Sequence, residues 1–139
     1  MQLLSPVIAK LVRREMIGVV ENGTGRRAHS GVKLPDGAVL PIGGKTGTGD
    51  NRLEQFGPHG RLLVSQVVNR TAAFVFFIGD RFYGTILAFV LGKTAANYKF
   101  TSALAVQVLK DLEPRLLPLL TSRASPSENA HASEALTVS

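Results

Sequence analysis

The sequence contains no cysteine, so the chain can form neither disulfides nor metal sites with thiolate ligands. It also lacks any run of about 18 uncharged apolar residues, the length that a transmembrane helix requires. The longest apolar stretch, residues 71–91, is interrupted by Gly79, Asp80 and Arg81, which together predict a turn between two strands. We therefore expect no membrane segment in this chain.

A secretory leader is missing as well. Lys10, Arg13 and Arg14 interrupt the apolar positions near the start of the chain, whereas a leader keeps its apolar core free of charge. Alone, the chain is expected to remain in the cytoplasm.

Metal-binding patterns are absent from the sequence. The three histidines, His29, His59 and His131, have no partner at the helical i, i+4 spacing of paired metal ligands. We expect no metal and no other cofactor.

The net charge of +6 raises the alternative of a module that binds an anionic polymer. The 16 basic residues are nevertheless spread along the chain, and the adjacent pairs are only Arg13-Arg14 and Arg26-Arg27. No nucleic-acid-binding motif accompanies them. We expect no nucleic-acid partner, and the anionic-polymer module is the weaker alternative.

Length and composition indicate one globular domain followed by a tail. The 139 residues are enough for a core, and 45% hydrophobic with 19% charged residues is ordinary for a globular protein. Residues 1–121 are predicted to form the domain. Residues 122–139 are rich in serine, alanine and glutamate without apolar periodicity, and are predicted to be disordered.

Periodicity predicts an α+β fold, an antiparallel sheet of three to four strands flanked by N- and C-terminal helices. Ser5 and Pro6 are typical of a helix start, and the helix should end near Val20, before the Asn-Gly-Thr-Gly sequence. Its apolar residues fall on one face; they are Leu4, Val7, Ile8, Leu11, Val12 and Met16. A second helix is predicted over residues 98–112, ended by Pro114.

The strands are predicted between these helices. Residues 26–49 form a hairpin with its turn at Pro35-Asp36-Gly37, and residues 50–70 are mostly loop, with a strand over 62–68. Residues 71–78 and 82–90 form an antiparallel pair, and their continuous apolar runs indicate burial on both faces. Phe74, Phe76 and Phe77 are expected in the core.

Residues 43–49, with the sequence Gly-Gly-Lys-Thr-Gly-Thr-Gly, carry the strongest chemical signal. Glycine lets another backbone approach closely, Lys45 supplies positive charge, and Thr46 and Thr48 supply hydroxyls. This combination suits a carboxylate. It does not form a phosphate-binding loop, because the first glycine of that pattern is replaced by Val39, and by Leu87 in the second Gly-Lys-Thr tripeptide.

A second motif lies upstream, where Val19–Gly25 has the sequence Val-Val-Glu-Asn-Gly-Thr-Gly. Together with Lys45-Thr46-Gly47, it resembles the penicillin-binding transpeptidases, particularly the C-terminal part of the transpeptidase domain of bifunctional peptidoglycan synthases. In that family, a helix ending in a Val-Val-x-x-Gly-Thr-Gly turn precedes the Lys-Thr-Gly strand by a short hairpin. The resemblance covers roughly residues 3–112 and implies a partial penicillin-binding/β-lactamase-like fold.

The resemblance also implies roles for four residues. Lys45 would assist catalysis electrostatically in a complete site, and Thr46 and Thr48 would bind the terminal carboxylate of a D-alanyl-D-alanine stem peptide or of a β-lactam. Gly47 would let the peptide backbone lie along the strand, and the Thr48 N–H would be an oxyanion donor. The family acts outside the cytoplasmic membrane, to which it is tethered.

The family's nucleophile is missing from this sequence. Ser30-Gly31-Val32-Lys33 matches Ser-x-x-Lys, but the following Pro-Asp-Gly is typical of a turn rather than a helix. Ser127-Glu128-Asn129 matches Ser-x-Asn but follows the Lys-Thr-Gly motif instead of preceding it. The chain is therefore predicted to be a transpeptidase fragment that is inactive alone, with an inactive interaction fragment as the alternative. We also expect self-association through an exposed apolar face.

Overall fold

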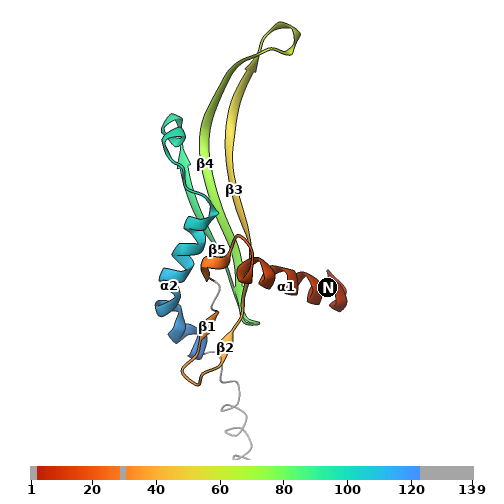
Figure 1. Cartoon of the computed structure of the whole chain (residues 1–139), viewed down its shortest axis with the longest axis vertical. Coiled ribbons are helices and arrows are strands. Elements are labelled where there is room, and N and C mark those ends of the chain that lie inside the picture. Colours follow the sequence, from red (N-terminus) through yellow and green to blue (C-terminus); the bar gives the residue numbers. More distant parts are fainter. Residues whose placement is uncertain (1–2, 29–30, 123–139) are drawn as a thin grey trace, which may run out of the picture.

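The computed structural model of the chain describes residues 3–28 and 31–122. These form an α+β fold, which confirms the predicted class (Figure 1). The elements, in chain order, are α1 (Pro6–Glu21), the 3-10 helix η1 (Arg26–Ala28), β1 (Val32–Lys33), β2 (Val39–Leu40), β3 (Ile42–Phe56), the 3-10 helix η2 (Pro58–Gly60), β4 (Leu62–Ile78), β5 (Phe82–Leu91), the 3-10 helix η3 (Lys93–Asn97) and α2 (Ser102–Ser122). The predicted disordered tail covers residues 122–139; Ser122 is instead the last residue of α2, and residues 123–139 lie outside the described residues.

Helix α1 begins and ends where the sequence predicts. The Ser5 hydroxyl accepts a hydrogen bond from the Ile8 N–H, and Pro6 occupies the first turn. At the other end, the Asn22 N–H donates to the Gly18 carbonyl, and Val20 is the buried residue of the helix. Most of its apolar face is exposed, and its N-terminal part points away from the sheet (Figure 1).

The hairpin predicted over residues 26–49 is present but divided. Val32 pairs with Leu40 and Lys33 with Val39, in a small two-stranded sheet whose turn is closed by the Leu34 N–H donating to the Ala38 carbonyl. Pro41 then separates this pair from β3, which belongs to a second sheet of order β3-β4-β5. All neighbouring strands in both sheets are antiparallel.

The prediction that residues 50–70 are mostly loop is wrong. Strand β3 continues to Phe56, β4 starts at Leu62, and the two remain paired up to the turn at residues 58–60. Strand β5 pairs with β4 only from Asn69 onward, so the upper part is a projecting two-stranded ribbon (Figure 1). Its β3 residues face solvent on both sides and carry no alternating apolar pattern, which is why periodicity missed it.

The core lies on one face of the three-stranded sheet, under α2. Phe74, Phe76 and Ile78 of β4 pack there with Val106 and Leu109 of α2. The expected burial of Phe74 and Phe76 is confirmed, and Phe77 is partly buried on the opposite face.

The predicted burial of β4 and β5 on both faces is wrong. Along β5, alternate residues are exposed, with Tyr83 at 78% and Leu87 at 61%. On β4, Val75 is exposed on the same side as these two. The reason is that α2 covers one face of the sheet, while α1 meets the other face near the β4–β5 turn. There, the Arg13 guanidinium stacks on the Phe77 ring at 4.4 Å.

Helix α2 starts later and ends later than predicted. It contains Pro114 and Pro118, although each proline lacks the backbone N–H that continues the ladder. Tertiary packing outweighs that loss, because the helical residues that follow Pro114 are held against the core; they are Leu116, Leu117 and Leu120. At the start, residues 98–100 are not helical, and the Arg70 Nε donates to the Phe100 carbonyl at 2.9 Å.

Candidate functional site

The Lys-Thr-Gly motif lies on β3, an edge strand of the three-stranded sheet. Beside it, the Gly79 N–H donates to the Pro41 carbonyl at 2.9 Å, and the register continues unchanged to Asn51. The N–H and C=O groups of successive residues point to opposite sides of an antiparallel strand. In this register, the backbone groups of Lys45 and Gly47 bond to β4, whereas those of Thr46 and Thr48 point away from it. The motif therefore offers outward backbone groups at its two threonines.

The glycines around the motif divide into two kinds. A Cβ on Gly44 would lie 2.5 Å from the Phe74 ring and from the Val75 carbonyl oxygen, so this glycine is required by core packing. A Cβ on Gly47 or Gly49 would meet nothing within 4 Å. The space above Gly47 is thus open to a ligand, as close backbone approach requires.

Thr46 is buried, with 8% of its surface exposed, on the face of the sheet that α2 covers. Its Oγ1 lies 2.5 Å from the Oγ1 of Thr24, in the Gly-Thr-Gly turn that follows α1. The two motifs that carried the resemblance in the sequence therefore meet in space, through their threonines.

Thr48 connects the same strand to α2. Its Oγ1 accepts a hydrogen bond from the backbone N–H of Ser102 at 2.7 Å, so it satisfies one of the orphan donors at the helix start. The hydroxyl keeps its own proton, which has no acceptor among residues 3–28 and 31–122. Thr48 can therefore still donate to an anion.

Lys45 is exposed on the opposite, open face of the sheet. Its Nζ donates to the Thr46 carbonyl at 2.8 Å, which holds the ammonium at the outer edge of β3. A carboxylate bound along this edge would compete with the neutral Thr46 carbonyl for the Lys45 ammonium. The carboxylate should be preferred, because a hydrogen bond between two ions is stronger than one to a neutral acceptor.

The two sequence matches to the family's other motifs do not form a second half of the site. Val32 and Lys33 lie in strand β1, so the residues after Ser30 do not start a helix. Ser30 itself and Ser127-Glu128-Asn129 lie outside the described residues. Sequence reasoning assigned no role to Thr24 or Ser102, although Thr24 stood within a quoted motif.

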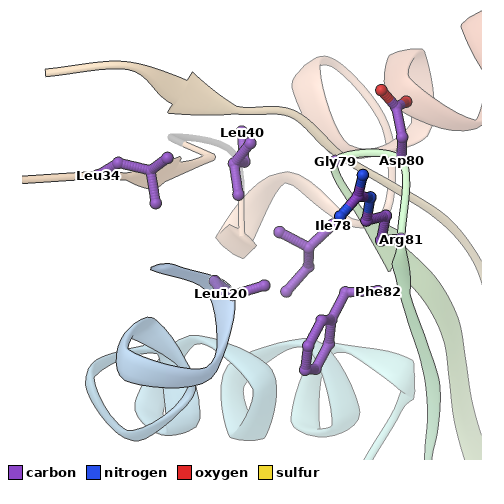
Figure 2. Close-up of a pocket in the computed structure, with 8 residues that line it drawn as sticks. All are labelled: Leu34, Leu40, Ile78, Gly79, Asp80, Arg81, Phe82 and Leu120. Carbon is purple, nitrogen blue, oxygen red and sulfur yellow. The ribbon is translucent and has the colours of Figure 1, made fainter. Parts of the chain in front are cut away.

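A cavity of about 180 Å³ lies elsewhere, between the small sheet, the β4–β5 turn and the end of α2. Figure 2 shows its apolar lining from Leu34, Leu40, Ile78, Phe82 and Leu120, with Gly79, Asp80 and Arg81 at the turn. No residue of the 43–49 motif lines it. We therefore place the candidate site at the edge of β3.

The described residues contain neither a metal-binding cluster nor a membrane-spanning helix. No cluster of three or more histidine, aspartate or glutamate side chains could hold a metal ion there. No helix in the same part of the chain is long and apolar enough to cross a membrane.

Comparison with known proteins found no family model that matches the chain and no significant match among curated proteins. The family resemblance therefore rests on the two sequence motifs.

Proposed function

We propose that this chain is the substrate-binding part of a penicillin-binding-type D,D-transpeptidase domain, with the partial fold of that family. One observation carries the proposal. The Gly-Thr-Gly turn and the Lys-Thr-Gly strand, 22 residues apart at their threonines, meet through the Thr24–Thr46 hydrogen bond at an edge strand. Such a meeting is what a shared site built from both motifs requires.

The chemistry of the edge suits an extended peptide with a free carboxylate. Outward N–H and C=O groups at Thr46 and Thr48 can pair with a peptide added as a further strand. Lys45 brings the positive charge, and Thr48 keeps a hydroxyl proton for the carboxylate. The Thr48 N–H would serve as an oxyanion donor, worth about 3 to 4 kcal/mol in the transition state.

The proposed substrates are stem peptides ending in D-alanyl-D-alanine, and β-lactams that carry the same carboxylate. No serine of this sequence stands in a Ser-x-x-Lys helix start, so the attacking hydroxyl would come from a further polypeptide segment. Complete enzymes of this kind act outside the cytoplasmic membrane. If no such segment assembles with this chain, the protein is an inactive interaction fragment that keeps the peptide-binding edge.

Titration calorimetry with an acyl-D-alanyl-D-alanine peptide and its C-terminal carboxamide tests the proposal. We expect the wild-type chain to favour the carboxylate by about tenfold or more, because a hydrogen bond to a charged group contributes about 1.5 to 3 kcal/mol. Lys45→Ala should remove most of this preference. Lys93→Ala is the matched control, since Lys93 is an exposed lysine in the other Gly-Lys-Thr tripeptide. Equal affinity for both peptides, or equal loss in both variants, would contradict the proposal.

A further inference from the structure

The Thr24–Thr46 pair connects the interior of the sheet with solvent. Thr46 is a buried polar side chain, and burying a hydroxyl without a partner is costly. Thr24 supplies that partner, yet Thr24 itself is exposed on the turn after α1. A ligand arriving from solvent at this end of the motif therefore reaches Thr24 before it reaches Thr46.

One of the two hydroxyl protons of Thr24 and Thr46 is available to a further acceptor. Two hydroxyls bring two protons, and only one of them can lie between the two oxygens. Neither threonine makes another side-chain hydrogen bond within the described part of the chain. Since Thr46 is buried and Thr24 is an exposed residue, the arrangement that leaves no proton enclosed has Thr46 donating to Thr24 and Thr24 donating outward.

The charges around the pair favour an anionic acceptor. Lys45 holds its ammonium on the Thr46 carbonyl, and the exposed Arg26 follows the turn in sequence. The next residue, Arg27, donates to the Gln107 side chain of α2 at 3.4 Å. Glu21, at the end of α1, is the acidic residue of this segment. The ammonium held on Thr46 favours a carboxylate over a cation or a neutral group.

We infer that Thr24 is a carboxylate-contacting residue of the peptide site, through the donor chain Thr46 to Thr24 to ligand. This inference rests on the proposed function, and it adds a residue from outside the Lys-Thr-Gly strand. It also changes the role of Thr46: its buried hydroxyl donates to Thr24 and does not contact the carboxylate.

The test compares Thr24→Val with Thr24→Ser, using the same carboxylate and carboxamide peptides. Valine should lower affinity for the carboxylate by about tenfold or more and leave affinity for the carboxamide unchanged, because one charge-assisted hydrogen bond is lost. Serine keeps the hydroxyl and should bind like wild type. Thr94→Val, at an exposed threonine of the second Gly-Lys-Thr tripeptide, is the matched control.

The outcomes separate this inference from the proposed function. If wild type prefers the carboxylate and Thr24→Val keeps the full preference, the Thr24 contact is wrong and the proposed function stands. If wild type shows no preference, both are wrong. Should the valine variant fail to fold, NMR of the wild-type chain decides: the carboxylate peptide should shift the Thr24 methyl signal more than the carboxamide does, and equal shifts would overturn the inference.

Discussion

At the scale of single residues, both threonines of the Lys-Thr-Gly-Thr sequence make hydrogen bonds to other elements of the fold. Thr46 bonds to Thr24 after α1, and Thr48 bonds to Ser102 at the start of α2. Hydrogen bonds therefore join β3 to the residues next to both helices, through the two side chains to which the family resemblance gives a substrate-binding role. A change at either threonine is therefore expected to alter helix attachment as well as the proposed ligand binding.

Substitutions at Gly44 and Gly47 would distinguish an effect on stability from an effect on peptide binding. Gly44→Ala should destabilise the fold by about 1 to 3 kcal/mol or more, since the new methyl would overlap the Phe74 ring and the Val75 carbonyl. Gly47→Ala should leave the free energy of unfolding nearly unchanged, because nothing lies within 4 Å of the added Cβ, but it should weaken peptide binding. Denaturant unfolding and calorimetry on both variants measure this, and equal stabilities would contradict the packing argument.

At the scale of elements, one arginine joins α1 to the β4–β5 turn. Arg13 Nη2 donates to the Gly79 carbonyl at 2.9 Å and lies 2.8 Å from an Asp80 oxygen, while its guanidinium stacks on Phe77. Near the C-terminal end of the helix, Val20 is buried in the core cluster with residues of the sheet. Arg13 therefore fixes the middle of α1 to the β4–β5 turn.

The three Arg13 contacts should contribute unequally. The Asp80 side chain is 88% exposed, and exposed ion pairs contribute little, so Asp80→Asn should change stability by less than about 1 kcal/mol. Arg13→Ala removes the carbonyl hydrogen bond and the aromatic contact as well, and should accelerate amide exchange in α1 more than Asp80→Asn does. Hydrogen exchange followed by NMR makes the comparison. Similar exchange in the two variants would show that the ion pair alone holds the helix.

At the scale of the whole molecule, a large apolar surface is left uncovered. Apolar residues of α1 and of the outer sheet face are exposed; they include Val7, Ile8, Leu11, Val12, Val75, Tyr83, Leu87, Phe89 and Leu91. Isolated exposed apolar residues are normal, but contiguous patches beyond a few hundred Å² are associated with interaction sites. Under the proposed function, a further half of the transpeptidase domain would cover the outer face of the sheet.

This surface leads us to expect self-association of the isolated chain. Sedimentation velocity over a range of concentrations should show oligomers that increase with concentration, because apolar area leaves water when copies associate. Leu87→Lys, at the centre of the outer β5 face, should reduce that association. Asp111→Lys, on the exposed side of α2, is a control that changes charge elsewhere. A monodisperse monomer at high concentration would contradict the expectation.

The missing nucleophile gives a second prediction for the whole chain. Incubation with a labelled penicillin should yield no covalent adduct by intact-mass spectrometry, since no serine occupies a Ser-x-x-Lys helix start. Heat-denatured chain provides the background level. Stoichiometric labelling would be incompatible with the proposed role, and labelling of Ser30 would show that its turn context was misjudged.

The sequence by itself determined the features that depend on neighbours along the chain. Ser5 and Pro6 start α1, the Pro-Asp-Gly sequence makes the hairpin turn, and residues 71–78 and 82–90 pair around Gly79. Each follows from local hydrogen bonding or from strand periodicity, which the sequence displays directly.

Tertiary structure alone decided the features that depend on distant residues. The ribbon of β3 and β4 extends beyond the sheet because backbone pairing continues where no apolar pattern marks it. Helix α2 continues through Pro114 because leucines beyond it pack on the core. The Thr24–Thr46 contact likewise joins residues from two motifs, and only the packing of the α1 turn against β3 brings their hydroxyls together. Local propensity carries no information about such contacts, because their free energy appears only after the chain has folded.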